Sequence, residues 1–340
     1  AESDMVQTAH ALRTLHRVVA PYHGLPGKLT ALKTIFAASD LTQARVLVLL
    51  DPAGPATEPE RVSELIRPVL QGQVDVLAPK YRRHPRDGVL ITQLVRPMVR
   101  GLYGVELDEP LGVELACAGR FTSHCLEQEI WDREAGRFAI DLWLRTEAIA
   151  QRYRVGQIWR PSPGASGTRT KLREAVRQIV LSLVESLRAH EPFWTGTEGV
   201  VSLPILGNDG MSVPAEPSPW DYEALGRQAR DTLKQISPLV GEVLTAPVLE
   251  RLLDGTGCTP LDDDLWVRVV YAFATAIGHR RGNVDHLVDM FVPIYMCRAS
   301  AFMAATAAEP AAAVQARLDS LCETFQRLKP VLVAGWSAEE

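Results

Sequence analysis

The stretch VLVLLDPAGP, residues 46–55, decides the fold class of this chain. Five consecutive apolar residues, Val46 to Leu50, have the length of a buried strand, and the Asp51-Pro52 pair that follows begins a turn. A buried strand that delivers one carboxylate to a loop resembles the edge of a nucleotide site. A metal ion at that edge would need a second acid beside Asp51, and Ala53 stands two positions further on.

The segments around this strand alternate between strand and helix patterns up to about residue 163. Such alternation is typical of a largely parallel sheet covered by helices. From residue 171 onward, apolar residues recur with helical spacing. We therefore predict an α/β domain over residues 1–165 and an all-helical domain over residues 166–340. The predicted strands of the first domain are 44–50, 74–81, 112–120 and 154–161, and its predicted helices are 28–39, 59–71 and 139–153.

The predicted α/β domain lacks a first strand. A nucleotide-binding α/β domain normally opens with a strand, but residues 1–19 have a helical pattern. The first convincing strand is the one that ends before Asp51. The sequence therefore predicts a domain without its leading strand.

Composition excludes several classes of protein. A formal net charge of -5 gives no general attraction to nucleic acid or to an anionic membrane. The five cysteines are scattered and never form a C-x-x-C pair, so neither a disulfide framework nor a zinc site is indicated. No segment resembles a signal peptide or a run of ~20 apolar residues that would span a membrane. We therefore expect a cytoplasmic protein without nucleic-acid or membrane partners.

A Pro-Gly turn precedes the predicted helix at residue 28. Lys28 and the first amides of that helix could meet a phosphate group, because helix starts carry positive partial charge and unpaired N–H groups. A plain turn with a solvated lysine gives the same pattern. The motif alone leaves both interpretations open.

Five segments taken in order resemble one family. They are PGKLTAL, VLVLLDPAG, APKYRRHPRDGVLITQLVRPMVRGLYG, DEPLGVELACAGR and RFAIDLWLRTEAIAQRYRVGQIWRP. Together they are similar to the retaining glycosyltransferases of GT-A fold in the mannosylglycerate synthase and glucosyl-3-phosphoglycerate synthase group. The resemblance covers residues 22–180 best. It implies transfer of a hexose from a nucleotide sugar to a small carboxylate such as glycerate or 3-phosphoglycerate.

The resemblance also implies roles for individual residues. Lys28 and Asp51 match groups near the donor nucleotide. Glu114 of PLGVE matches an acid beside the sugar, and Asp141 of AIDLW matches a carboxylate at the reacting centre. Thr92 of LITQ matches a contact to the acceptor carboxylate.

Further acceptor contacts and the metal site follow from the same resemblance. A basic residue of YRRHPR, Arg83 or His84, matches a second contact to the acceptor. The family holds manganese or magnesium with an Asp-x-Asp motif and a histidine. Asp51 is kept, but Ala53 and Ser166 stand where the other two ligands are expected.

Two functions stay open from the sequence. One is an active transferase in which Lys28 and arginines neutralise the diphosphate, with or without a metal. The other is a pseudoenzyme with a degenerate metal site that binds a nucleotide sugar or serves assembly, since fold resemblance does not secure function. A dinucleotide-binding protein is disfavoured because no G-x-G-x-x-G follows a strand. The apolar faces of the last two helices would also suit a homodimer.

Overall fold

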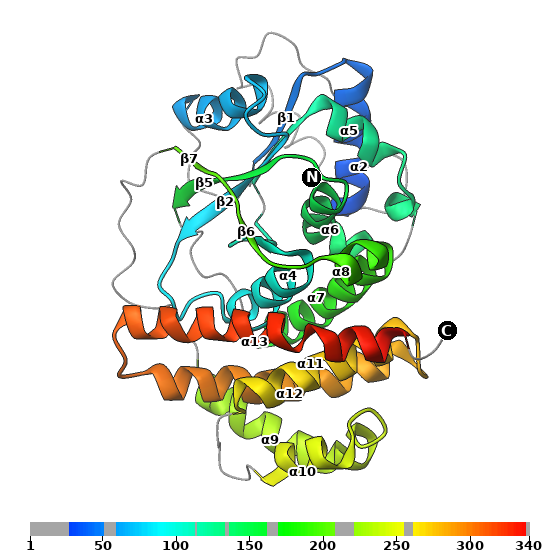
Figure 1. Cartoon of the computed structure of the whole chain (residues 1–340), viewed down its shortest axis with the longest axis vertical. Coiled ribbons are helices and arrows are strands. Elements are labelled where there is room, and N and C mark those ends of the chain that lie inside the picture. Colours follow the sequence, from blue (N-terminus) through cyan, green and yellow to red (C-terminus); the bar gives the residue numbers. More distant parts are fainter. Residues whose placement is uncertain are drawn as a thin grey trace, which may run out of the picture.

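The chain folds as a mixed α/β structure with a central sheet and many helices (Figure 1). The computed structural model describes residues 27–50, 59–112, 114–132, 136–161, 169–207, 221–254 and 261–337. Residues 1–26, and with them the predicted absence of a leading strand, lie outside this part. Asp51, Ala53 and Ser166 also lie outside the described residues.

The sheet has five strands in the order β1-β4-β2-β5-β7. Strand β4 runs antiparallel to both β1 and β2, whereas β2, β5 and β7 run parallel to one another. All strands but β4 therefore point the same way, which confirms the predicted largely parallel sheet. The strands are β1 (Val46–Leu49), β2 (Val76–Arg82), β4 (Leu115–Ala118), β5 (Val155–Pro161) and β7 (Ile205–Leu206).

Apolar residues cover both faces of this sheet, as strands buried on both sides require. Leu77 packs with residues of α3 (Pro59–Leu70) on one face, in a small core. Its neighbours Val76 and Ala78 point to the other face and join the main core, because successive side chains alternate along a strand. In addition to α3, the first half contains the helices α2 (Lys28–Leu41), α4 (Arg96–Tyr103), α5 (Gly119–Leu126), η2 (Glu129–Asp132) and α6 (Gly136–Ala150).

The second half is not entirely helical, which corrects the prediction. Two short strands, β6 (Val201–Ser202) and β7, lie between α8 (Glu191–Gly196) and α9 (Tyr222–Val240). Strand β7 adds to the sheet beside β5, and β6 pairs with β3 (Val105–Glu106). Gly199 and Gly207 bracket the segment at positive φ, where glycine is favoured, so the chain turns sharply at both ends. Only pairing with strands from the first half makes this extended segment recognisable.

The remaining helices form layers below the sheet (Figure 1). Helix α13 lies against α4 and α11, and α12 packs on α9. Helix α12 is long and apolar enough to cross a membrane, but 78% of its apolar window is buried inside the structure. A buried core helix satisfies the same composition. The helices are α7 (Arg169–Ala189), α10 (Ala246–Asp254), α11 (Asp263–Gly278), α12 (Val284–Thr306) and α13 (Ala311–Ser337).

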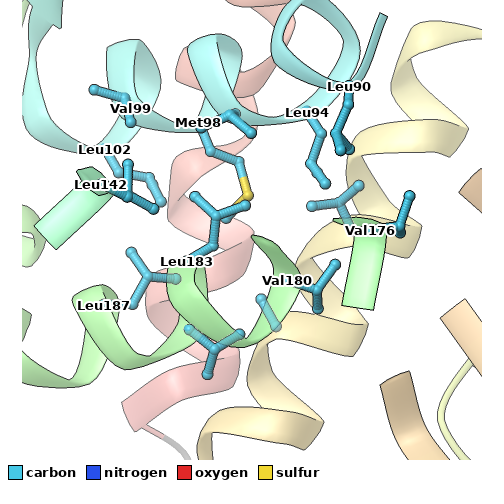
Figure 2. Close-up of a cluster of buried hydrophobic side chains, with 14 of the residues drawn as sticks. Leu90, Leu94, Met98, Val99, Leu102, Leu142, Val176, Val180, Leu183 and Leu187 are labelled. Atoms are coloured by element: carbon cyan, nitrogen blue, oxygen red, sulfur yellow. The ribbon is translucent and has the colours of Figure 1, made fainter. Parts of the chain in front are cut away.

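One hydrophobic core joins the two halves of the chain. Figure 2 shows Leu94 and Met98 from the first half facing Val176 and Leu183 of α7. The predicted division of the chain at residue 165 stays a prediction. What the structure establishes is that the helices of the second half are packed directly on α4 and the segment before it.

Candidate active site

The carboxyl-terminal ends of β2 and β5 meet at one edge of the sheet, because these strands run parallel. In open α/β sheets, ligands bind outside this edge. Helices α2, α3 and α6 each lead by a short connection into the next strand, so their first turns lie toward the same edge. Helix starts carry positive partial charge. The edge is therefore suited to an anionic ligand.

Lys28 is the first residue of α2, and its ammonium forms an ion pair with the carboxylate of Asp141 in α6. Both side chains are partly exposed. The N-cap of α2 is Gly27, which has no side chain to cap the helix, and no described residue caps its first turn with a side chain, so these amides suit an anionic ligand. The structure thus brings together a predicted donor contact and a predicted catalytic carboxylate.

Glu114 lies just before β4, at the same edge. Its carboxylate is 3.2 Å from Nε of Arg160, a buried residue of β5. Arg160 also pairs with Glu64 at 3.1 Å and donates to the carbonyl of Arg61, both in α3. The carboxylate of Glu114 is therefore held on the side of the sheet that α3 covers.

A buried arginine connects Glu114 to Asp141. Arg145 is 1% exposed and donates to the carbonyl oxygens of Asp141 at 2.8 Å, Glu114 at 2.9 Å, and Gly112. One guanidinium thus fixes the backbone on both sides of the candidate centre. Arg145 follows Asp141 by four positions in FAIDLWLR, which puts it on the same face of α6. Sequence reasoning missed it, although this spacing was the available signal.

The three predicted acceptor residues, Arg83, His84 and Thr92, line a single pocket of about 730 Å³. It lies at the carboxyl end of β2, and residues of α13 form another part of its wall. Figure 1 shows α13 passing below β2. Three predicted residues of the donor and catalytic groups, Lys28, Glu114 and Asp141, do not line it. The other residues of the pocket wall include Lys80, Tyr81, Arg82, Arg96, Arg100, Glu106, Asp108, Glu109, Trp159, Gln315 and Asp319.

Thr92 belongs to a short π-helix, η1 (Ile91–Val95), that runs into α4. Such segments are rare and are frequent at functional sites. The neighbouring Gln93 is held from outside the pocket: Trp266 Nε1 donates to its carbonyl at 2.8 Å, and Arg298 Nε donates to its side chain at 2.8 Å. Thr92 Oγ1 is buried and has no hydrogen-bond partner among the described residues.

Buried polar atoms without partners gather in this pocket. Thr92 Oγ1, Arg83 Nε, Arg100 Nη1 and Glu109 Oε2 are all buried, and none has a hydrogen-bond partner in the part of the chain that the structure describes. Such atoms are few in folded proteins, and each calls for a partner such as water, an ion or a ligand. Donors and acceptors without partners therefore come from three separate segments of the wall of this pocket.

The charges of the pocket are mostly paired. Arg83 Nη2 is 2.6 Å from Glu109 Oε1, and Arg96 Nε is 3.3 Å from Asp108, which also pairs with Lys80. Arg82 stacks over Trp159, with 3.9 Å from the guanidinium carbon to the ring centroid. Stacked and paired guanidinium groups are pre-oriented for a planar or tetrahedral anion.

The pKa values of His84 and Glu109, two residues of the pocket wall, differ from their usual values. Burial lowers the pKa of His84, and the nearby Arg86 lowers it further, so the imidazole is neutral at pH 7 and is a weak anion contact. Burial raises the pKa of Glu109 to about 7, against the opposing effect of Arg83. Of the two basic residues expected from the sequence, Arg83 is therefore the better contact for an anion.

A metal site does not form among the described residues. They contain no group of three His, Cys, Asp or Glu side chains placed to hold a metal ion. Asp141 and Glu114 are engaged by Lys28 and Arg160 instead. Asp51, the metal ligand expected from the sequence, lies outside the described residues, so the metal site stays a prediction.

Comparisons with known proteins find similarity among solved structures. No protein-family model matches the chain, and no curated protein matches it. Among solved structures, the chain is similar to glucosyl-3-phosphoglycerate synthase from Mycobacterium tuberculosis, described in complex with manganese, UDP-glucose and phosphoglyceric acid. The matched regions are 19% identical, with a TM-score of 0.37. The match covers 49% of this chain and 56% of that one, so the chain spans about half the length of the synthase it matches.

Proposed function

We propose that the protein is a retaining glycosyltransferase that moves a hexose from a nucleotide sugar to a small carboxylate acceptor such as glycerate or 3-phosphoglycerate. The observation that supports it most is the pocket in which Thr92 Oγ1, Arg83 Nε and Glu109 Oε2 are buried without partners. A ligand that both accepts and donates hydrogen bonds would satisfy them. Glycerate does so, because it carries a carboxylate and hydroxyl groups.

The donor is proposed to lie at the carboxyl edge of the sheet, beside Lys28 and Asp141. The diphosphate would meet the ammonium of Lys28 and the amides at the start of α2, both of which favour negative charge. Asp51, two positions after the last residue of β1, is proposed as the contact to the nucleotide. These groups would supply the charge balance that a metal supplies in related reactions.

The acids at this edge are proposed to place the sugar. As the leaving diphosphate draws Lys28 toward itself, the carboxylate of Asp141 becomes free to stabilise positive charge at the anomeric carbon. Glu114, fixed by Arg160, would hold sugar hydroxyl groups. Arg145 and Tyr81 connect the acceptor pocket with this centre. Each of these two residues lies near Glu109 of the pocket and near Glu114 of the centre. Acceptor and donor could then react on one face of the sugar, with retention.

The alternative is a binding protein without transferase activity. It is favoured by Ala53 and Ser166, which replace a carboxylate and an imidazole at positions where related enzymes bind the metal. Such a protein would still bind a nucleotide sugar at the same edge. Binding alone therefore does not separate the two functions, whereas turnover does.

The deciding experiment measures turnover of nucleotide hexoses with glycerate and with 3-phosphoglycerate, in the presence of manganese and of a chelator. We expect product with retained configuration and a weak response to manganese. The double variant Ala53→Asp with Ser166→His restores the two ligand types that suit manganese, so we expect it to bind the ion and turn over faster. Asp141→Asn should abolish turnover in either background.

One outcome would count against the transferase, and another against its metal-free arrangement. Absence of product from wild type and from the double variant, while a nucleotide sugar still raises the melting temperature, would favour the binding protein. Tight manganese binding by the wild type, measured by calorimetry, would overturn the metal-free arrangement and place additional ligands outside the described residues.

A further inference from the structure

Glu109 has no role in the reaction proposed so far, although it is the most deeply buried acid of the pocket. It is 3% exposed and lies three residues after β3, in the loop that leads to β4. One carboxylate oxygen, Oε1, is 2.6 Å from Arg83 Nη2. The other, Oε2, has no hydrogen-bond partner among the described residues. A buried carboxylate oxygen without a hydrogen-bond partner destabilises the folded state unless another group binds to it.

Arg83 is held against Glu109 by the shape of the turn after β2. Gly88 adopts a positive φ of 63°, and a Cβ atom at this position would overlap Arg83 Nη1. Arg83 also lies over the ring of Tyr81, 5.4 Å from its centroid. The guanidinium is therefore packed in place while one of its hydrogen-bonding edges is used by Glu109.

An anionic acceptor would compete with Glu109 for this guanidinium. Two carboxylates cannot both remain charged and buried beside one arginine without strong repulsion. Repulsion is relieved when one of them takes up a proton. The ligand carboxylate is strongly acidic and has a partner in Thr92, so the proton goes to Glu109.

We propose that Glu109 is a proton-coupled specificity residue: an anionic acceptor takes over Arg83, and Glu109 takes up a proton at Oε2 and donates it as a hydrogen bond to the acceptor. This inference rests on the proposed acceptor pocket. It explains why Oε2 is idle in the free protein, because the unprotonated oxygen is an acceptor with no donor in reach. An acid that stays charged would instead repel the ligand.

The surroundings of Glu109 support proton uptake near neutrality. Burial raises its pKa to about 7, Arg83 opposes this, and Asp108 adds to it. Arg145 of α6 also lies close and favours the charged form, and Tyr81 faces it from β2. When a ligand neutralises Arg83, the largest opposing effect is lost, so the pKa of Glu109 rises further. Acceptor affinity must then fall as the pH rises above about 7, by up to about tenfold per pH unit.

The test is calorimetric titration of the full chain with glycerate, which has no group that titrates between pH 6.5 and 8.5. Measurements in buffers of different ionisation enthalpy give the number of protons taken up. We expect uptake of up to one proton per glycerate at pH 7.5 and declining uptake below pH 6.5, where Glu109 is already neutral. 3-Phosphoglycerate serves as a second probe of the same pocket.

Variants assign the proton to its residue. Glu109→Gln keeps the shape and the hydrogen-bond donor but cannot titrate, so uptake should vanish and glycerate affinity should become independent of pH. Asp319→Asn removes another acid of the same pocket wall, one whose side chain is 52% exposed, and uptake should persist. Uptake that survives in Glu109→Gln would overturn the inference.

The wild-type measurement separates this inference from the proposed function. If glycerate binds and the heat of binding does not depend on the buffer, Glu109 is not proton-coupled, and the acceptor pocket stands. If neither ligand binds at any pH from 6 to 8.5, the acceptor pocket itself is wrong.

Discussion

Lys28 forms an ion pair with Asp141 although 113 positions separate them in the sequence. One residue begins the helix before β1, and the other lies in the helix before β5. Their meeting places both helices with their first turns at the carboxyl edge of the sheet. A cation and an acid that are adjacent in the free protein could separate when a diphosphate takes the cation, which frees the acid for chemistry.

The Lys28–Asp141 pair is expected to matter for activity and little for stability. Lys28→Met should weaken nucleotide-sugar binding about tenfold, and Asp141→Asn should abolish turnover while binding persists. Both side chains are partly exposed, so each variant should unfold within about 1 kcal/mol of wild type. Turnover, calorimetry and urea unfolding measure the three quantities. Asp40→Asn, which changes an exposed acid of the same helix at its other end, should leave all three unchanged.

Arg145, in contrast to the Lys28–Asp141 pair, is expected to contribute strongly to stability. Arg145→Met removes hydrogen bonds to three backbone carbonyls in a buried place, so we expect a loss of about 3 kcal/mol in unfolding free energy. Arg227→Met, which removes an exposed pair with Glu223, should cost less than about 0.5 kcal/mol. Guanidinium unfolding of both variants compares the two. Equal midpoints would show that Arg145 does not hold the loop at Glu114.

Substitution of Thr92 is expected to weaken acceptor binding without lowering the stability of the protein. Its hydroxyl is buried without a partner in the described structure, so Thr92→Val should be neutral or stabilising by up to about 1 kcal/mol. The same change should weaken glycerate binding about tenfold and leave donor binding unchanged. Thr146→Val is the matched control, because that buried hydroxyl donates to the carbonyl of Leu142 at 3.1 Å. It should lose about 1 kcal/mol of stability without a change in binding.

The lowered pKa of Asp75 predicts that the stability of the protein depends on pH. Burial alone would raise its pKa, but hydrogen bonds from Arg154 and Arg120 outweigh burial and hold the pKa at about 2, below the usual 3.8. A lowered pKa stabilises the fold above pH 3.8, and this contribution is lost as the pH falls toward 2. The contribution is on the order of 2 kcal/mol.

The measurement compares wild type and Asp75→Asn by urea unfolding between pH 2 and pH 6. The wild type should be more stable by on the order of 2 kcal/mol at pH 6, and the difference should shrink below pH 4. A difference that does not change with pH would assign the effect to packing rather than to the charge.

The sequence predicted the local elements well because their signals are local. The apolar run from Val46, the helical spacing after Lys28 and the alternation between strand and helix each depend on neighbours within one or two turns. Strands β1, β2, β4 and β5 and helix α6 lie where the pattern placed them. Strand β7 was missed because two residues carry no periodicity, and only pairing with β5 defines them.

The sequence named some residues of the candidate site, and their roles stay predictions. Resemblance of motifs gave Thr92 and Arg83, which the structure brings to one pocket, and Lys28 and Asp141, which it pairs. It did not give Glu109, because an acid in a polar loop has no local signal. Its importance depends on burial and on the contact with Arg83, which come from different segments.

What the sequence by itself determined is therefore the class of most segments and the acidic net charge. Tertiary structure alone decided which charges meet, how deeply they are buried and which polar atoms stay without partners. The physical reason is that periodicity and propensity act over a few residues. Ion pairing, desolvation and the pKa of Glu109 depend on groups that are distant in the chain and close in space.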